Sequence, residues 1–224
     1  MFSAMLEVHP KDDQFNAYLG MAKMLRPELE AIDGFLDNSR FSSLTHDGWL
    51  LSLSSWRDEK SLVRWRSKAN HHKTMQTARD RVFSDYRLRI GETVADTQVP
   101  AGQSLAQQRL DATETGEGKA VTLLDGKYAA DRVKEAGADA VAKSLGLDTA
   151  ASSLIRWDVF DAIATPGDVI AVATWADLDA AKAFESDTKL PDSVRLRHIR
   201  IVREYGMFDR REAPQYFAEI KPNA

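Results

Sequence analysis

Alternating apolar and polar positions divide the first half of the chain into short segments. Residues 1–9 are rich in apolar side chains and predict a strand, whereas 11–32 carry apolar residues at the spacing of an amphipathic helix. Pro27 is expected to end or kink that helix. Two strands joined by a turn at 46–48, a helical region and a last alternating strand follow. The predicted order is therefore β-α-β-β-α-β.

This order is typical of a ferredoxin-like unit, in which helices cover one face of an antiparallel sheet. We assign residues 1–94 to such a unit and the polar stretch 95–118 to a linker. The pattern then restarts and gives a second unit over 119–206, followed by a C-terminal extension over 207–224. The expected fold class is α+β, with two tandem ferredoxin-like units.

The two halves also resemble each other residue by residue. Residues 50–65 lie over 169–184 without a gap, so that Trp56 matches Trp175 and Trp65 matches Phe184. Each sheet has one face without helices, and that face needs a partner. We therefore expect the two sheets to close face to face into a single-chain α/β-barrel pseudo-dimer. A pocket is then expected between sheet and helices.

Composition and charge narrow the function. Hydrophobic residues make up 43% of the chain, which suffices for a core, and the net charge of −4 argues against nucleic-acid binding. No apolar run is long enough to span a bilayer, and the first residues lack the pattern of a signal peptide. The absence of cysteine excludes disulfides and thiol chemistry. We expect a cytoplasmic protein with neither a nucleic-acid nor a membrane partner.

Two adjacent histidines, His71 and His72, stand in a charged helical stretch. A neutral His71 can ligate haem iron or accept a proton from a phenolic substrate, and a purely structural histidine is the alternative. His72 points about 100° away on a helix and is expected at the surface. The helical His-x-x-x-His spacing of a metal site is absent.

Other side chains near His71 have functional and structural interpretations. Trp65 can stack on a flat ligand or pack in the core, and the Asn70 amide can hold an oxygen atom or cap a helix, the cap being favoured. Arg79 can pair with a ligand carboxylate or with an aspartate of the chain. Because His71, Asn70 and Arg79 lack counterparts in the second half, we expect the first half to hold the site.

The stretch 51–90 resembles the antibiotic-biosynthesis monooxygenase domain, a dimeric α/β-barrel family, and 203–217 is similar to the tail of tandem-domain members. The residues that carry the resemblance follow the family's order, with alanine in place of the family's glycine before the arginine: Trp56, Asp58, Trp65, His71, Ala78-Arg79, Phe83 and Tyr86. The resemblance implies His71, Asn70 and Trp65 as catalytic residues. It implies Arg79, Phe83 and Tyr86 as substrate-binding residues.

The resemblance implies a monooxygenase that acts on a small aromatic or polycyclic molecule with O2 and no cofactor. It equally allows a haem-binding protein, haem-degrading or haem-dependent, with His71 as the iron ligand. A non-catalytic module that holds a small apolar ligand is the third hypothesis. The C-terminal extension either packs on its own chain, which we favour, or contacts a second copy in a homodimer.

Overall fold

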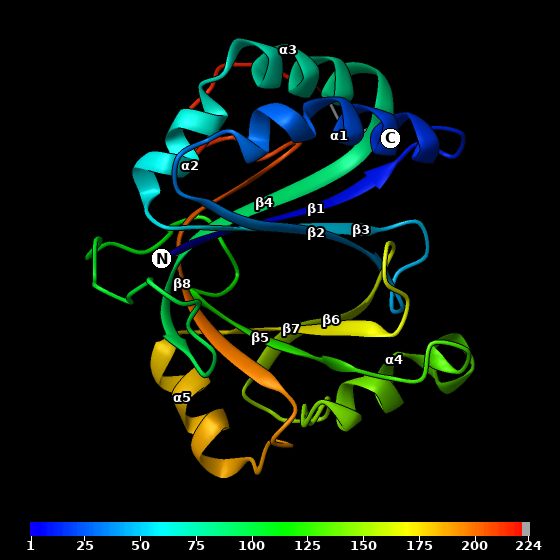
Figure 1. The fold of residues 1–224 in the computed structure, drawn as a ribbon, viewed down its shortest axis with the longest axis vertical. Helices are drawn as coiled ribbons and strands as arrows, with labels where there is room; N and C mark the ends of the chain where they lie inside the picture. Colours follow the sequence, from blue (N-terminus) through cyan, green and yellow to red (C-terminus); the bar gives the residue numbers. More distant parts are fainter. Residues whose placement is uncertain (221–224) are drawn as a thin grey trace.

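The computed structural model describes residues 1–220 and places two helix-covered sheets face to face (Figure 1). The elements of the first unit are β1 (Phe2–Pro10), α1 (Phe15–Glu30), β2 (Phe35–Ser43), β3 (Leu50–Trp56), α2 (Glu59–Arg66), α3 (Ala69–Thr77), a π-helical turn η1 (Ala78–Val82) and β4 (Phe83–Asp96). Those of the second unit are β5 (Ala120–Lys127), α4 (Val133–Ser144), β6 (Leu154–Ala162), β7 (Asp168–Trp175), α5 (Leu178–Asp187) and β8 (Arg195–Gly206).

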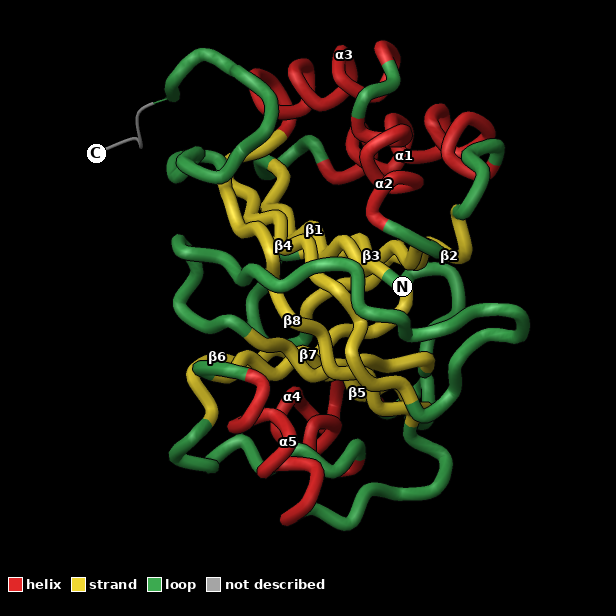
Figure 2. Tube along the Cα trace, turned by 90° about the vertical axis from the view of Figure 1, so that its left-hand side faces the viewer, coloured by secondary structure: helices red, strands yellow, loops and turns green. Residues whose placement is uncertain are grey.

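The strands form one closed barrel in the order β1-β3-β2-β6-β7-β5-β8-β4. A short ladder between β2 and β6 and a long ladder between β4 and β8 join the two sheets. Helices α1, α2 and α3 cover the outer face of the first sheet, and α4 and α5 cover that of the second (Figures 1 and 2). The predicted α+β fold with two ferredoxin-like units in one barrel is confirmed.

Several element ends differ from the sequence-based expectation. Pro27 lies inside α1, and the helix continues to Glu30. This is tolerated because proline removes only one N–H donor close to the end of the helix. Strand β4 runs to Asp96, so the connection to β5 is shorter than the predicted linker. The last four residues of the predicted C-terminal extension lie outside the described residues.

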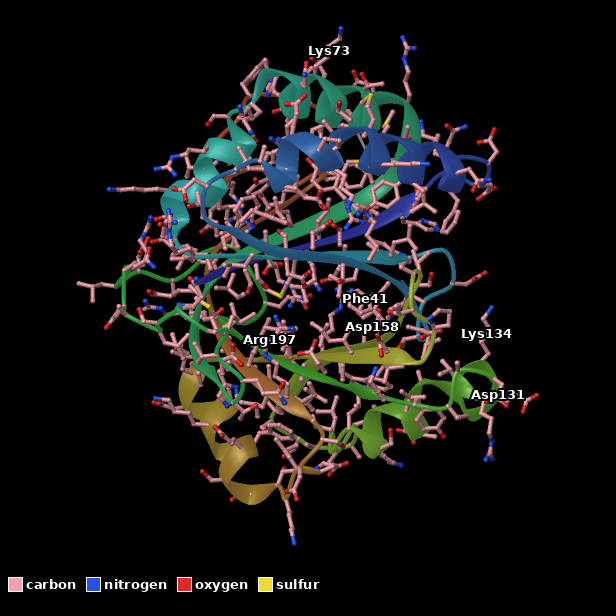
Figure 3. All side chains as sticks on the ribbon, viewed as in Figure 1. Phe41, Lys73, Asp131, Lys134, Asp158 and Arg197 are labelled. Carbon is pink, nitrogen blue, oxygen red and sulfur yellow. The ribbon has the colours of Figure 1, made fainter. Side chains whose placement is uncertain are left out.

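Apolar side chains form a cluster inside the barrel, and charged side chains lie next to this cluster. Figure 3 shows Phe41, Asp158 and Arg197 between the two sheets. The apolar cluster consists of Met5, Phe41, Leu51, Leu53, Val121, Leu123, Phe160, Ala162, Ile170, Val172, Ile199 and Ile201. Burial of this apolar surface from both sheets stabilises the contact between the two units.

A buried carboxylate also joins the units inside the barrel. Glu7 of β1 accepts hydrogen bonds from Arg89 at 2.5 Å and from Arg87 at 3.0 Å, and Arg156 of the second unit lies 3.7 Å away. Arg89 donates a further bond of 2.9 Å to Thr174 of β7. Burial by itself raises the pKa of Glu7, but the three guanidinium charges outweigh it and lower that pKa to about 2.

Side chains fill the space between sheet and helices in the second unit. Trp175 is fully buried there and stacks on Phe184 of α5 at a centroid distance of 5.1 Å. Trp56 is equally buried in the first unit, so both repeated tryptophans are structural, as expected from their recurrence. Among the helices of residues 1–220, none is both long and apolar enough to cross a membrane.

Candidate functional site

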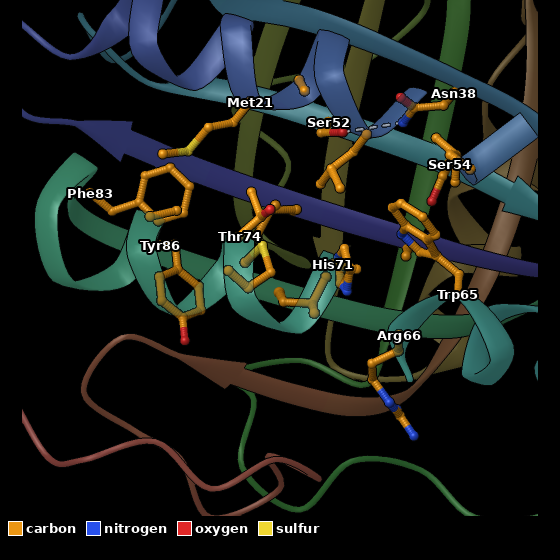
Figure 4. A pocket seen from close by; sticks show the side chains of 18 of the residues that line it. Met21, Asn38, Ser52, Ser54, Trp65, Arg66, His71, Thr74, Phe83 and Tyr86 are labelled. Atoms are coloured by element: carbon orange, nitrogen blue, oxygen red, sulfur yellow. Dashed lines mark hydrogen bonds between the residues drawn. The ribbon is translucent and has the colours of Figure 1, made fainter. Parts of the chain in front are cut away.

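A cavity of about 150 Å³ lies between the first sheet and helices α1, α2 and α3 (Figure 4). Met21 and Leu25 of α1, Trp65 of α2 and His71 of α3 contribute to its helical side. At the equivalent strand positions of the second unit, Val159, Ala171 and Ala173 belong to a buried apolar core. The expected pocket between sheet and helices is therefore present in the half that carries His71.

Strand register divides the floor of the cavity into an apolar and a polar half. Leu88, Leu6, Ser52 and Arg40 pair one after another across β4, β1, β3 and β2, so they form one row across the sheet. Side chains two residues apart on a strand share a face, so the next row lies on the same face. Strands β1 and β4 supply the apolar half, and β2 and β3 supply the polar half. The floor residues are Ala4, Leu6, Leu88 and Ile90, with Asn38, Arg40, Ser52 and Ser54.

His71 lies in the first turn of α3. Its ring packs against Trp65, and the two ring centroids are 4.5 Å apart. Its Nδ1 atom is buried without a hydrogen-bond partner among the described residues. Burial lowers the pKa of His71 to about 4, because the imidazolium form loses hydration. At neutral pH the cavity therefore contains a neutral imidazole, which can accept a proton or a hydrogen bond.

The start of α2 fixes the position of Trp65. The Asp58 carboxylate accepts a 2.7 Å hydrogen bond from the backbone N–H of Ser61 and so caps the helix. In the second unit Asp177 caps α5 in the same way, with a 2.9 Å bond from the N–H of Ala180. The repeated acidic residue thus has a structural role in both halves, and each cap orients the aromatic residue that follows it.

Phe83 and Tyr86 line the end of the cavity where β4 begins, as their predicted substrate-binding role requires. The Tyr18 ring of α1 meets Phe83 edge-on at 5.8 Å. The Tyr86 hydroxyl accepts hydrogen bonds from Arg79 at 3.2 Å and from Arg210 at 2.6 Å. Trp65, His71, Phe83 and Tyr86 are therefore brought together around one cavity.

Asn70 and Arg79 are not among the residues that line this cavity. Asn70 is exposed and donates a 2.5 Å bond to Glu28 of α1, because it lies on the outer face of α3. It is not the helix cap either, since α3 begins at Ala69 after Lys68. Arg79 is buried and donates a 2.6 Å bond to the carbonyl of Met207, which makes it an anchor for the C-terminal residues.

Residues 207–220, which we call the C-terminal strap, cross the open side of the cavity. Arg210, Gln215 and Phe217 of the strap are lining residues. Phe217 stacks on His72 at 5.1 Å with an angle of 12° between the rings, and Arg210 lies 5.0 Å from the centre of the Phe217 ring. His72 thus contacts the strap rather than solvent alone, and the strap packs on its own chain.

Sequence reasoning missed the polar half of the floor. A usable signal existed, because Ser52 and Ser54 lie over Ala171 and Ala173 in the gapless match of the two halves. Polar residues at core-facing positions of only one repeat indicate a cavity rather than a packed core. No such signal points to the strap as a lining segment, because the match between the two halves covers 50–65 and 169–184 and does not reach residues 207–220.

The lining residues give the cavity a positive character. Arg40, Arg66 and Arg210 line it together with His71, and no aspartate or glutamate is among the described lining residues. No group of three or more metal-ligating side chains occurs within residues 1–220. The arrangement can hold a small, largely apolar molecule, favour an anionic group on it and present a neutral imidazole.

Comparisons with known proteins identify the family of the chain. Residues 1–77 match the model of the antibiotic biosynthesis monooxygenase family. The chain is 41% identical over 222 residues to a protein of Pyricularia oryzae named "Jasmonate monooxygenase ABM", covering 97% of this chain and 98% of that protein.

Two solved structures share much less sequence. A presumed monooxygenase from Lactobacillus acidophilus NCFM is 10% identical, with a TM-score of 0.39 over 91% of this chain and 94% of its own. A conserved protein from Methanosarcina mazei Go1 is 17% identical, with a TM-score of 0.37 over 40% of this chain and 88% of its own. The near full-length match to the Pyricularia oryzae protein shows that this chain belongs to the antibiotic biosynthesis monooxygenase family.

Proposed function

We propose that this chain is a monooxygenase that binds a small, largely apolar substrate in the first-unit cavity and oxidises it with O2. The observation that carries the proposal is the asymmetry between the units. The first unit has a cavity lined by His71 and Trp65, whereas the second-unit positions equivalent to the polar floor, Val159, Ala171 and Ala173 among them, belong to a buried apolar core. A cavity retained at the expense of core packing is a usual sign of a ligand site.

The substrate belongs, in this proposal, to the class of small cyclic compounds with an acidified C–H bond. A phenolic aromatic ring meets this description, and so does a jasmonate, whose cyclopentanone carries an apolar chain and a carboxylate arm. The name of the Pyricularia oryzae relative supports the second choice. The half-polar, half-apolar floor also supports it, because such a floor matches a molecule with one polar end.

His71 acts as the proton acceptor in the proposed reaction. It removes a proton from the substrate, and the carbanion passes an electron to O2 before the two radicals join in a C–O bond. Loss of water from the resulting hydroperoxide leaves a carbonyl, so one oxygen atom enters the product and the other leaves as water. The substrate carbon supplies all the electrons, and no external reductant is needed.

The lowered pKa of His71 limits this step. An imidazole with a pKa of about 4 is neutral at pH 7 and available, but it is a weak base. Proton transfer is favourable only while the substrate anion stays next to the imidazolium, because the ion pair offsets the desolvation that depresses the pKa. The closed apolar surroundings of Trp65 and Leu25 keep the two partners together.

A haem fits these residues poorly. A neutral imidazole is the form that ligates iron, but the Trp65 ring covers His71 at a centroid distance of 4.5 Å. The cavity of about 150 Å³ is also far smaller than a porphyrin. The proposed reaction therefore does not use a haem.

Oxygen uptake by the purified protein tests the proposal. We expect jasmonic acid or an aromatic carbon acid to drive uptake, and one labelled oxygen atom from isotopically labelled O2 to appear in the product. The His71→Phe variant, which keeps a flat ring against Trp65, is expected to lower the rate by about a hundredfold or more. Saturable binding without any oxygen uptake would instead support a non-catalytic ligand-binding module.

A further inference from the structure

We propose that Arg40 binds the carboxylate of an amphipathic acid and makes the cavity selective for anionic substrates over neutral ones. The inference deepens the proposed function and rests on the same cavity. It assigns the polar half of the floor, on β2 and β3, to the head of the ligand. The apolar half, on β1 and β4, then faces the rest of the molecule.

The first argument is the comparison of equivalent strand positions in the two units. Arg40 pairs with Ser52 in the first sheet, and at the equivalent place Val159 pairs with Ala171 in the second. Asn38 pairs with Ser54, and its equivalent is Trp157 paired with Ala173. The second unit therefore places apolar side chains at every position where the first has a polar one.

Core-facing polar side chains are destabilising unless they have partners. The second unit shows that the fold does not need them at these positions, since Val159, Ala171 and Ala173 belong to or contact a continuous apolar core. The polar set of the first unit has thus a role other than packing. Ligand binding is the role that a cavity in contact with it supplies.

The second argument concerns the charge of Arg40. The barrel arginines Arg87 and Arg89 pair with Glu7, whereas Arg40 has no ion pair among the described residues. Its Nε atom is buried without a hydrogen-bond partner in residues 1–220, as are those of Arg87 and Arg89, so the missing ion pair is what separates Arg40 from these two. No acidic side chain is among the described lining residues, so residues 1–220 supply no counter-ion there. A carboxylate would satisfy both the charge and the open N–H group.

Arg40 is better placed for this role than the other two arginines of the cavity. Arg210 already donates to the Tyr86 hydroxyl at 2.6 Å and to the carbonyl of Gln215 at 2.8 Å. Arg66 lies at the end of α2, and its side chain is directed away from Ser52 and Asn38 (Figure 4). The Tyr18 side chain is hydrogen-bonded to Arg40, and burial raises the pKa of Tyr18 despite the opposing effect of Arg40, so its hydroxyl stays neutral and leaves the charge of Arg40 uncompensated.

Calorimetric titration with octanoate and 1-octanol tests the inference, because the two probes share one chain and differ in the charged head. At pH 7.5 we expect the wild-type protein to bind octanoate at least about tenfold more tightly than octanol. Arg40→Met is expected to weaken octanoate binding by about ten- to a hundredfold and to leave octanol binding nearly unchanged. Arg40→Lys should restore part of the preference, because it restores the charge without the planar fork.

The matched control is Arg64→Met, which removes an equal charge from the exposed face of α2. It should keep the wild-type preference, and circular dichroism and melting curves establish that each variant is folded. Equal binding of the two probes by the wild type, or binding of neither, would overturn the proposal. So would a loss of preference in Arg66→Met rather than in Arg40→Met.

Jasmonic acid and its methyl ester separate this inference from the proposed reaction. If octanoate binding depends on Arg40 but no acid drives oxygen uptake, the anion site stands and the proposed reaction fails. If jasmonic acid and its ester are oxidised with equal efficiency by both the wild type and Arg40→Met, the reaction stands and the anion site is refuted.

Discussion

His71 is the residue whose environment differs most from that of an ordinary surface histidine. Its pKa in the folded protein is lowered to about 4 by burial, against 6.5 for an unperturbed histidine. As the pH falls below 6.5 the unfolded chain takes up a proton first, so the stability of the folded state decreases until the pH reaches about 4. We expect His71 to account for about 2 kcal/mol of lost stability between pH 7 and pH 5.

Urea unfolding of the wild type and His71→Phe at these two pH values measures this contribution. The variant should show a smaller loss of unfolding free energy than the wild type, because phenylalanine has no proton to bind. An identical loss in both proteins would mean that His71 is not held neutral by its surroundings.

Residue-level predictions succeeded where local sequence determines the direction of a side chain. Trp65, Phe83 and Tyr86 have apolar rings at core-facing positions, and each of them lines the cavity with His71. Asn70 points away from this cavity because neighbouring residues on a helix point in different directions, and the boundary at Ala69 turns its amide outwards. Which neighbour faces inwards depends on where the helix begins.

The C-terminal strap is the element on which closure of the cavity depends. Phe217 is held by the His72 ring at 5.1 Å and by Arg210 at 5.0 Å. Truncation in Phe217→Ala removes an aromatic contact of about 0.5–1.5 kcal/mol. We expect the KM for the substrate to rise about two- to tenfold, because the open form of the strap becomes more populated.

Tyr216→Ala is the matched control for this prediction. Tyr216 is the neighbouring aromatic residue and is 89% exposed, so its removal should leave the KM unchanged. Steady-state kinetics of both variants make the comparison. If both raise the KM equally, the strap acts through its general order and not through the Phe217 stack.

Helices and strands were predictable wherever the sequence has a hydrophobic period or a helix-capping residue. Asp58 and Asp177 start α2 and α5, and alternation identifies the strands. The sequence shows the strap only as a tail of mixed aromatic and charged residues. A segment without a hydrophobic period does not indicate which of its side chains point towards the protein. The strap contacts Tyr86 and His72, which lie more than a hundred positions before it in the chain.

At the scale of the whole molecule, the Glu7 network joins the two units inside the barrel. Glu7→Gln leaves Arg89, itself 1% exposed, with an uncompensated charge. We expect this variant to lose about 3–5 kcal/mol of unfolding free energy at pH 7, as measured by urea denaturation. The difference from the wild type should shrink below pH 4.5, because the pKa of Glu7 is about 2 only in the folded protein and the wild type loses its advantage as the pH falls.

An exposed ion pair supplies the control at this scale. Asp33 pairs with Arg57 at 2.7 Å on the surface, and its side chain is 72% exposed. Asp33→Asn should therefore change the stability far less than Glu7→Gln. Equal effects of the two substitutions would show that burial inside the barrel does not strengthen the Glu7 contacts.

The sequence by itself determined the fold class, the two units, the repeated tryptophans and caps, and the half that contains the cavity, because these depend on local periods and on a match between two segments. Only the tertiary structure decided which side chains share the cavity, that Arg79 anchors the strap, and that Arg40 lies beside Ser52 without an ion pair in residues 1–220. Strand register and long-range packing set these contacts, and neither is encoded in the neighbours of a residue along the chain.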